Sequence, residues 1–275
     1  MDYSFIREDF DINSISKNIL SIQVSLDGFS FVISSTENKQ SPDYIYIKTI
    51  DHSKETLNGE LLSFTGFDSR EFYSIRIIIH TSGFTLVPEK YFDLKDMKAY
   101  LNLNHSARLN RKVLSNSISS VGAVCVFSIE DELYKLLKSK FPGADFCHSS
   151  LPFCTMAVNK RTDGCFIQIY EKSMELAVIK NLKLSHYNIF ELQGGNDIIY
   201  FALSSYREYG LNPLLNPLYI SGILTKNSET VAIAKKYIQD LRYYQTDYVI
   251  VAEEGEFQYP SHYFLNHREI LNCEL

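Results

Sequence analysis

The segment Gly194-Gly195-Asn196-Asp197 has residue types and a spacing that could hold a phosphate group. Two glycines in front of a helix leave backbone N–H groups open to an anion at the positive end of the helix dipole. The segment is no P-loop, because no Gly-Lys-Ser/Thr follows it. The alternative is a tight turn in which Asn196 or Asp197 caps the next helix. Both interpretations stay open from the sequence, so nucleotide or anion binding remains one hypothesis for this segment.

A second group, Cys147-His148 with Cys154, has residue types that could bind a metal ion. A structural zinc site normally takes four ligands in paired short spacings, and this chain has no Cys-x₂-Cys pair. The alternative is that these thiols are buried and reduced, which we expect for all five cysteines. They are Cys125, Cys147, Cys154, Cys165 and Cys273.

A third group lies near the end of the sequence, where His262 and His267 occur with Tyr263 and Glu269. A catalytic histidine needs a nucleophile or an acid as its partner, and the sequence identifies none. We therefore expect this segment to dock back on a lobe of the protein, with its histidines in structural hydrogen bonds.

The composition limits the classes of function. The 275 residues are enough for two domains of about 130 residues each, and 45% of them are hydrophobic, which is sufficient for full cores. Acidic residues outnumber basic ones, 33 to 27, and no basic stripe occurs, so we do not expect nucleic acid as a partner. The start of the sequence is acidic, no apolar run approaches 18 residues and the cysteine count is odd. We expect a cytoplasmic protein without membrane insertion.

In the first half, residues 20–35 alternate apolar and polar side chains around Asp27-Gly28, which predicts a β-hairpin with a two-residue turn. A third strand is predicted at 44–50. A helix closed by Gly66 is predicted over 52–66, and strands are predicted at 73–80 and 84–87. A short helix is predicted over 93–103.

In the second half, a strand pair leads into a helix that we expect to begin at a capping box, Ser128 to Asp131, and to stop at Pro142-Gly143. The remaining elements alternate between strands and helices. They are a short strand at 146, a helix over 149–157, three strands within 165–190, a helix over 197–209, a strand at 218–223, a helix over 228–243 and a strand at 248–252.

The two hairpin blocks resemble each other. SIQVSLDGFSFVIS (21–34) aligns with FIQIYEKSMELAVI (166–179), and the alignment places Gln23 on Gln168. Only two positions are identical, so the alternative that any two hairpins alternate in this way stays open. The blocks begin about half the chain apart, and each opens a unit of three strands and a helix. This spacing favours a duplicated lobe.

With these blocks in place, the chain resembles actin-like proteins of the kind that serve as type IV pilus and type II secretion adaptors. The segment from Gly122 to Val158 is similar to their strand, helix, Pro-Gly stop, short strand and small-residue helix. Gly194-Gly195 resembles their turn before the next helix, and the strand 219–223 resembles their nucleoside-side strand, with Gly222 where two glycines are usual. The chain looks most similar to an uncharacterised domain-of-unknown-function family found in Bacteroidota.

The resemblance implies ATP held between two hairpins, with an Asp near each turn to organise Mg²⁺. This sequence departs from that pattern, because Gln23 and Gln168 occupy the places of the acids. A neutral amide cannot replace a carboxylate on Mg²⁺ at comparable strength, and the expected links Asp27-Gly28 and Lys172-Ser173 are too short to wrap a phosphate. Asp27 could be a displaced metal ligand, or simply the first residue of a type I′ turn.

The fold class expected from the resemblance is α/β, a duplicated ribonuclease-H-like fold of the actin-like ATPases, with a mixed central sheet flanked by helices in each lobe. The lobes are expected at 1–110 and 111–275, and residues 111–160 could instead pack with the first.

The expected function is that of a degenerate actin-like module without ATPase activity, acting as an adaptor or scaffold for a protein partner. A homodimer is left open. The alternative is an ATPase or kinase that uses displaced carboxylates such as Asp27 or Asp197. We expect no catalytic residue, metal or cofactor, and a vestigial nucleotide cleft formed by Gly194, Gly195, Asn196 and Gly222 with Gln23, Asp27 and Gln168.

Overall fold

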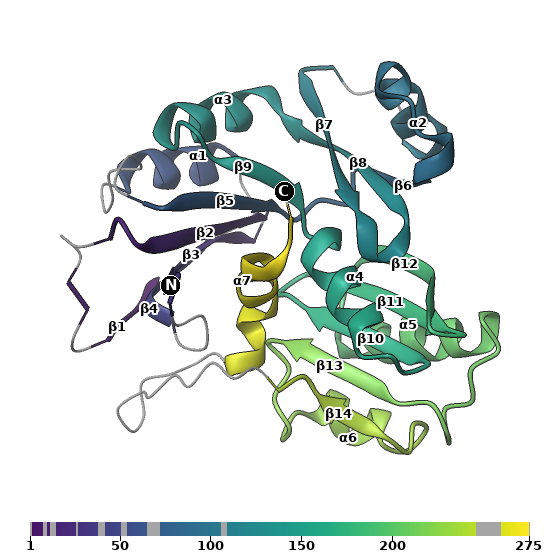
Figure 1. The fold of residues 1–275 in the computed structure, drawn as a ribbon. Coiled ribbons are helices and arrows are strands. Elements are labelled where there is room, and N and C mark those ends of the chain that lie inside the picture. Colours follow the sequence, from purple (N-terminus) through teal and green to yellow (C-terminus); the bar gives the residue numbers. More distant parts are fainter. Residues whose placement is uncertain are drawn as a thin grey trace. The chain divides into compact units, whose positions relative to one another are not determined.

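The computed structural model describes residues 2–7, 10–11, 15–25, 27–37, 42–50, 54–64, 72–105, 109–245 and 260–274 (Figure 1). The chain divides into two compact units. Among the described residues, unit 1 holds those up to Pro152 together with 266–274, and unit 2 holds 153–245 together with 260–265.

The main sheet of unit 1 has the strand order β1-β4-β3-β2-β5-β9. The central strand β2 pairs antiparallel with β3 and parallel with β5. Leu20, Ile22 and Val24 point to one face of β2 and are buried, so one face of the sheet forms an apolar core. The strands are β1 (Asp2–Ile6), β2 (Asn18–Ser25), β3 (Gly28–Ser35), β4 (Pro42–Thr49), β5 (Ser74–Ile79) and β9 (Asp145–His148).

A second sheet of unit 1 contains three antiparallel strands in the order β6-β8-β7. Leu101 of α2 packs into a small core with Val87, Val124 and Val126. The elements are β6 (Phe84–Pro88), β7 (Arg111–Ile118), β8 (Ala123–Glu130) and α2 (Met97–Asn104), with short 3₁₀ turns at Glu89–Tyr91, Leu94–Asp96 and Ser119–Val121. The strand β9 then pairs with β5, and residues 111–152 belong to unit 1, as in the alternative division in which residues 111–160 pack with the first lobe.

Two helices of unit 1 differ from their expected bounds. The helix α1 spans Lys54–Ser63, and Gly66, expected to close it, lies outside the described residues. The helix α3 spans Asp131–Lys140 and does not start at a Ser128 cap. Ser128 is still in β8, where its hydroxyl accepts a hydrogen bond from Arg111 at 2.8 Å, so it serves the strand pair instead.

Unit 2 repeats the plan of the first sheet. Its strand order β12-β11-β10-β13-β14 matches β4-β3-β2-β5-β9, with β10 antiparallel to β11 and parallel to β13. The helices α5 and α6 pack on one face, over a core that includes Ile167, Ile169 and Val231. The elements are β10 (Gly164–Ile169), β11 (Ser173–Lys180), β12 (Lys183–Glu191), β13 (Leu218–Gly222), β14 (Leu241–Tyr243), α4 (Ser150–Asn159), α5 (Gly195–Glu208) and α6 (Glu229–Ala234).

The register of the two hairpins is the same. Gln23 lies opposite Ser30 on β3, and Gln168 lies opposite Glu175 on β11, at the same separation along the chain. The alignment of the two blocks is therefore confirmed, and the duplicated α/β fold with it.

Both hairpin loops contain two residues but begin one residue earlier than expected. Ser25 pairs with Gly28, so Gly28 belongs to β3 and Asp27 lies in the first loop. The Tyr170 N–H donates to the Ser173 carbonyl at 2.8 Å, which leaves 171 and 172 in the second. The interpretation of Asp27-Gly28 as the turn was wrong because Gly28 serves packing. A Cβ on Gly28 would lie 2.0 Å from the Lys48 carbonyl oxygen on β4.

One long helix expected from the sequence is short. The helix α6 ends at Ala234, and residues 241–243, expected to be helical, form β14 beside β13. The strand expected at 248–252 lies outside the described residues. Among the described residues, no helix combines the length and the apolar composition needed to cross a membrane.

The last part of the chain is a run of short helical turns (yellow in Figure 1). They are a 3₁₀ turn at Ser261–Phe264, α7 (Leu265–Glu269) and a 3₁₀ turn at Ile270–Asn272. Phe264 is buried with unit 2, and Ile270 and Leu271 are buried with unit 1. The expectation that this segment docks back on the protein is confirmed.

Candidate functional site

Gln23 lies in the middle of β2 and is buried. Its cross-strand neighbours are Ser30 on β3 and Ile78 on β5, so the flanking strands place a hydroxyl and an alkyl group beside it rather than a carboxylate. At the hairpin tip, the Asp27 N–H donates to the Ser25 hydroxyl at 3.1 Å, and the Asp27 carbonyl accepts from the Ile50 N–H at 3.0 Å. These backbone contacts fix Asp27 as a turn residue.

Gln168 is fully buried in β10, and both polar atoms of its amide lack a hydrogen-bond partner within the described part of the chain. Glu175 lies opposite it on β11, where its carboxylate accepts hydrogen bonds from the hydroxyls of Tyr170 at 3.1 Å and Tyr187 at 2.8 Å. Ser221 lies opposite it on β13, and its hydroxyl donates to the Ile167 carbonyl at 2.9 Å. The groups nearest to Gln168 in the sheet are therefore engaged with other partners.

The N-terminus of α5 already carries an anionic group of the chain. The Asp197 carboxylate accepts hydrogen bonds from the backbone N–H groups of Gln193 at 2.6 Å and Gly194 at 3.3 Å. An incoming phosphate would meet this negative charge where the resemblance implies that phosphate binds. The structure therefore supports the capping interpretation for Asp197. Asn196 lies exposed in the first turn of the helix.

Two of the candidate glycines are explained by packing inside unit 2. A Cβ on Gly195 would lie 2.2 Å from the Thr230 hydroxyl oxygen of α6. Gly222 has a φ of +92°, and a Cβ there would lie 1.9 Å from the Ile169 carbonyl oxygen. Gly194 differs, because no atom lies within 4 Å of the position that its Cβ would take. Packing thus accounts for Gly195 and Gly222 without a bound phosphate, whereas it does not account for Gly194.

His148, in the Cys147-His148 segment, makes hydrogen bonds to other parts of the fold. The His148 Nε2–H donates to the Thr81 carbonyl at 2.8 Å, and Nδ1 accepts from the Ser150 hydroxyl at 2.9 Å and the Ser150 N–H at 3.1 Å, which caps the start of α4. Within the described ranges, no group of three or more His, Cys, Asp or Glu side chains could hold a metal. Burial raises the pKa of the Cys125 thiol to about 12, so that thiol is neutral and poorly nucleophilic.

Two serine–histidine pairs in this region have spacings that would suit a nucleophile and a base. They are Ser150 with His148 at 2.9 Å and Ser149 with His80 at 3.3 Å. All four side chains are buried, so we interpret their hydrogen bonds as structural.

His267 joins the two strands of the first hairpin. Its Nδ1 lies 2.8 Å from the Ser21 hydroxyl and its Nε2 lies 2.7 Å from the Ser30 hydroxyl. The Ser21 hydroxyl donates to the Val32 carbonyl, so its oxygen accepts from Nδ1–H, and the Ser30 hydroxyl donates to Nε2. Burial lowers the pKa of His267 to about 3, so the imidazole is neutral. The expectation of structural hydrogen bonds is confirmed here.

His262 lies against the turn that ends β13. The pKa of His262 is lowered to about 4, mainly because the ring is buried. The charge of Lys226 also lowers the pKa, whereas a hydrogen bond to the Gly222 backbone partly offsets the shift. The ring packs on Tyr243 with centroids 5.1 Å apart. In unit 2, His262 thus contacts Gly222, the glycine that the resemblance places on the nucleoside-side strand.

Sequence reasoning missed the partners of the last segment. Arg76 of β5 donates to the carbonyls of Ile270 and Cys273, the latter at 2.9 Å. The signal was present as Ser21, Ser30 and Arg76, polar residues with apolar neighbours on both sides in their strands.

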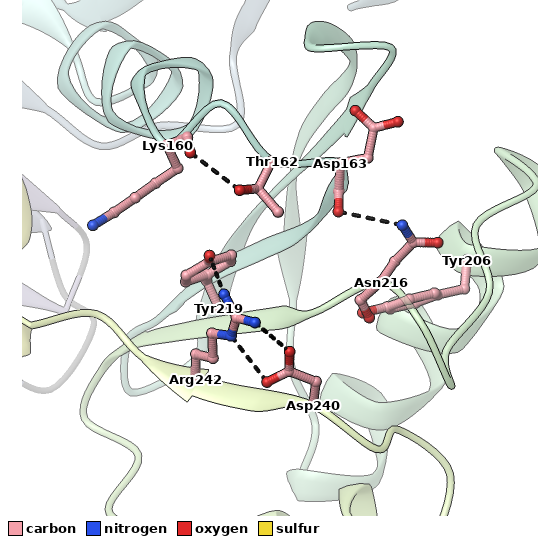
Figure 2. Close-up of polar contacts among 8 residues, drawn as sticks. All are labelled: Lys160, Thr162, Asp163, Tyr206, Asn216, Tyr219, Asp240 and Arg242. Atoms are coloured by element: carbon pink, nitrogen blue, oxygen red, sulfur yellow. Dashed lines mark hydrogen bonds and ion pairs between the residues drawn. The ribbon is translucent and has the colours of Figure 1, made fainter.

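The edge of the sheet in unit 2 carries an ion pair. Arg242 binds Asp240 in bidentate fashion, at 3.0 and 2.6 Å, and reaches the Tyr219 hydroxyl at 3.0 Å (Figure 2). The Asp240 carboxylate compensates the charge of Arg242, and the contact of Arg242 with Tyr219 links β14 to β13.

The model of one protein family, described as Protein of unknown function (DUF3822), matches residues 7–241. A search among curated proteins gives no match. A solved structure from Bacteroides thetaiotaomicron VPI-5482, a protein with actin-like ATPase fold and unknown function, matches with a TM-score of 0.80 at 21% identity, covering 96% of this chain and 99% of that one.

Two further solved structures are similar. One is the PilM–PilN type IV pilus biogenesis complex, with a TM-score of 0.53 at 13% identity over 92% of this chain and 97% of that one. The other is the cytoplasmic domain of EpsL, an inner membrane component of the type II secretion system of Vibrio cholerae, with 0.51 at 9% identity over 94% and 96%. At these identities the likeness shows the fold, and the expected actin-like fold is confirmed.

Substitutions of Gly222 and Gly194 by alanine test whether packing is the reason that a candidate position holds a glycine. Gly222→Ala should lower the free energy of unfolding by about 3 kcal/mol or more, because its Cβ would overlap the Ile169 carbonyl at a positive φ. The matched control Gly194→Ala, with open space, should stay within about 0.5 kcal/mol of the native chain. Urea unfolding measures both. Equal losses would show that packing at Gly222 is not the reason for its glycine.

Because the amide of Gln168 is unpaired, we expect that its replacement by an apolar side chain does not destabilise the protein. Gln168→Met keeps the shape and removes two unsatisfied buried atoms, so the free energy of unfolding should stay level or rise by about 1 kcal/mol. Gln168→Glu, the control, adds a carboxyl beside Glu175 and should lower it. A loss of more than about 1 kcal/mol in the Met variant would mean that the amide has a partner.

The neutral His267 predicts a pH dependence. Its pKa is about 3 when folded and about 6.5 when unfolded, so the stabilisation is complete above 6.5 and is lost progressively as pH falls towards 3. From pH 7.5 to 5.5 the native chain should lose about 1.4 kcal/mol more than His267→Gln, which lacks the titrating group. Urea unfolding at both pH values measures this. Parallel losses in the two proteins would show that His267 is not buried in neutral form.

Proposed function

This chain belongs to the DUF3822 family of proteins of unknown function, and we propose that it is a degenerate actin-like module without ATPase activity that binds another protein as an adaptor or scaffold. The observation that carries the proposal is the pair of buried glutamines at equivalent register in the two units, Gln23 and Gln168.

The chemistry of magnesium supports the loss of nucleotide hydrolysis. Mg²⁺ dehydrates reluctantly, keeps several waters and is held by one or two carboxylates together with substrate phosphates. An amide oxygen carries no net charge, so Gln23 and Gln168 offer neither the electrostatic attraction nor the ordering of waters that a carboxylate provides. Catalysis of phosphoryl transfer consists almost entirely of such positioning and charge stabilisation.

The surroundings of each glutamine support the same conclusion. In unit 1, the hydroxyl of Ser30, the residue opposite Gln23, is bound to His267 at 2.7 Å. In unit 2, Asp197 caps α5 and His262 lies on the Gly222 backbone. Groups that a nucleotide would need are therefore committed to contacts within the chain.

The binding role is supported by what similar folds do. One similar structure is a complex of PilM with PilN, and another is the cytoplasmic domain of a secretion-system component. The net charge of −6 does not suit a nucleic-acid partner, so we propose a protein as the partner.

Thermal unfolding with Mg-ATP tests the proposal. The melting temperature should move by less than about 1 °C at millimolar Mg-ATP, because a ligand that does not bind the native state adds no stability. Phosphate release should equal that of a buffer blank.

A rise of several degrees would contradict the proposal, since a ligand at a hundred times its Kd adds about 2.7 kcal/mol. Asp27→Ala identifies the cause of any hydrolysis. Activity that disappears in this variant would assign metal binding to a displaced carboxylate.

A further inference from the structure

Four connecting segments of unit 2 meet at one end of its sheet, which we call the loop end. The strand β10 is antiparallel to β11 and parallel to β13, and β13 is parallel to β14. The start of β10, the turn after β11 and the segments before β13 and β14 therefore lie together. The Asn216 amide donates to the Asp163 carbonyl at 3.4 Å (Figure 2), and the Gln239 N–H donates to the Pro213 carbonyl at 3.0 Å. The segments are residues 160–163, 181–182, 210–217 and 235–240.

The loop end carries exposed apolar side chains. The exposed fractions are 55% for Leu182, 59% for Leu214, 76% for Leu215 and 53% for Tyr237. In the part of unit 2 that the structure describes, Tyr200 of α5 is the other large apolar side chain that is more than half exposed. Apolar side chains that gather in this way are typical of an interaction surface.

Leu182 occupies a position where the backbone disfavours its side chain. Asn181 and Leu182 connect β11 to β12, with φ of 53° and 60°. A two-residue turn with positive φ at both positions favours glycine at the second. The Asp163 carboxylate accepts hydrogen bonds from both N–H groups of the turn at 2.9 Å, which holds it in this conformation. Because the leucine side chain is mostly exposed, packing does not explain it, and a residue in such a conformation points to function.

The loop that carries Leu214 and Leu215 is fixed by two asparagines. The Asn212 N–H donates to the Asn216 side-chain oxygen, and the Asn216 N–H donates to the Asn212 carbonyl, both at 2.8 Å. The Asn212 side-chain oxygen also accepts from the Leu214 N–H at 2.9 Å. The loop thus holds its exposed leucines in place, so their binding to a partner would cost little ordering.

Basic side chains surround these apolar groups. Arg161, Lys183, Lys235 and Lys236 are exposed, and with respect to the described residues none of the four lies in an ion pair. Counting the residues next to the four segments, cations outnumber acids: Lys160, Arg161, Lys180, Lys183, Arg207, Lys235, Lys236 and Arg242 against Asp163, Glu208 and Asp240. The loop end is therefore basic, although the whole chain has a net charge of −6. The sequence shows no basic stripe because the fold brings these residues together from four segments.

We propose that the loop end of unit 2 binds an anionic lipid surface. Apolar side chains can enter the boundary between head groups and acyl chains, while lysines and arginines around them attract anionic head groups. Tyrosine, here Tyr237, is enriched at that boundary. Nucleic-acid phosphates would also attract the cations, but they give exposed leucines no apolar partner. The contact is peripheral, and the inference goes beyond the proposed adaptor role without depending on it.

Sedimentation of the full-length chain with lipid vesicles tests the proposal. Vesicles of equal parts phosphatidylcholine and phosphatidylglycerol should bind the native chain about ten times more tightly, or more, than vesicles of phosphatidylcholine alone. Raising the salt concentration should weaken the binding, because it screens the attraction between cations and head groups. The charge variant Arg161→Gln/Lys183→Gln/Lys235→Gln should lose most of the preference for anionic vesicles.

The leucines are tested by substitutions of exposed side chains, which leave the fold intact. Leu182→Gly/Leu214→Ser/Leu215→Ser should bind anionic vesicles about ten times more weakly than the native chain. The matched control is Leu103→Ser on α2, an equally apolar side chain that is 81% exposed, and it should bind as the native chain does. Leu182→Gly alone should weaken vesicle binding and yet raise the melting temperature by about 2 °C, because glycine accepts the positive φ.

Three results would overturn the proposal. They are no binding of the folded native chain to anionic vesicles, equal binding to both kinds of vesicle, and unchanged binding by the triple leucine variant. The first would leave the exposed leucines to a protein partner. None of these measurements involves Mg-ATP, so the failure of lipid binding and the failure of the proposed function can be distinguished.

Discussion

A polar side chain in the middle of a buried sheet strand must find partners, or it destabilises the fold. Each unit of this protein carries one such residue on its central strand, Gln23 or Gln168, at the same register. What surrounds these two amides limits what the protein can do. A carboxylate at this place could hold a magnesium ion through its waters, whereas an amide in the same place carries no net charge to attract the ion.

The polar residues around the central glutamine have different partners in the two units. In unit 1 His267 links Ser21 and Ser30 on two strands through neutral hydrogen bonds. In unit 2 the carboxylate of Glu175 is held by two tyrosine hydroxyls, and Gln168 keeps an unpaired amide. The two units thus share one strand order, and the polar residues beside their central glutamines make hydrogen bonds within the chain. The fold is that of actin-like ATPases, and a fold by itself does not decide the chemistry of its site.

The sequence predicted those parts of the structure that depend on local patterns. Alternation identified both hairpins, and the aligned glutamines predicted the duplication. The errors occurred where distant contacts decide the local structure. Gly28 was placed in a turn, although the approach of Lys48 on β4 is what requires a glycine there. Residues 241–243 were predicted to be helical, although they pair with β13. No local pattern could reveal that Ser21 binds His267, because 246 residues separate the two.

The central claim is that Gln23 and Gln168, which carry no charge, do not hold a magnesium nucleotide. A crystal structure grown with Mg²⁺ and a non-hydrolysable ATP analogue tests it most directly. The account predicts electron density for His267 between Ser21 and Ser30, and no metal near Gln23 or Gln168. A magnesium ion and a triphosphate bound beside these two residues would contradict it.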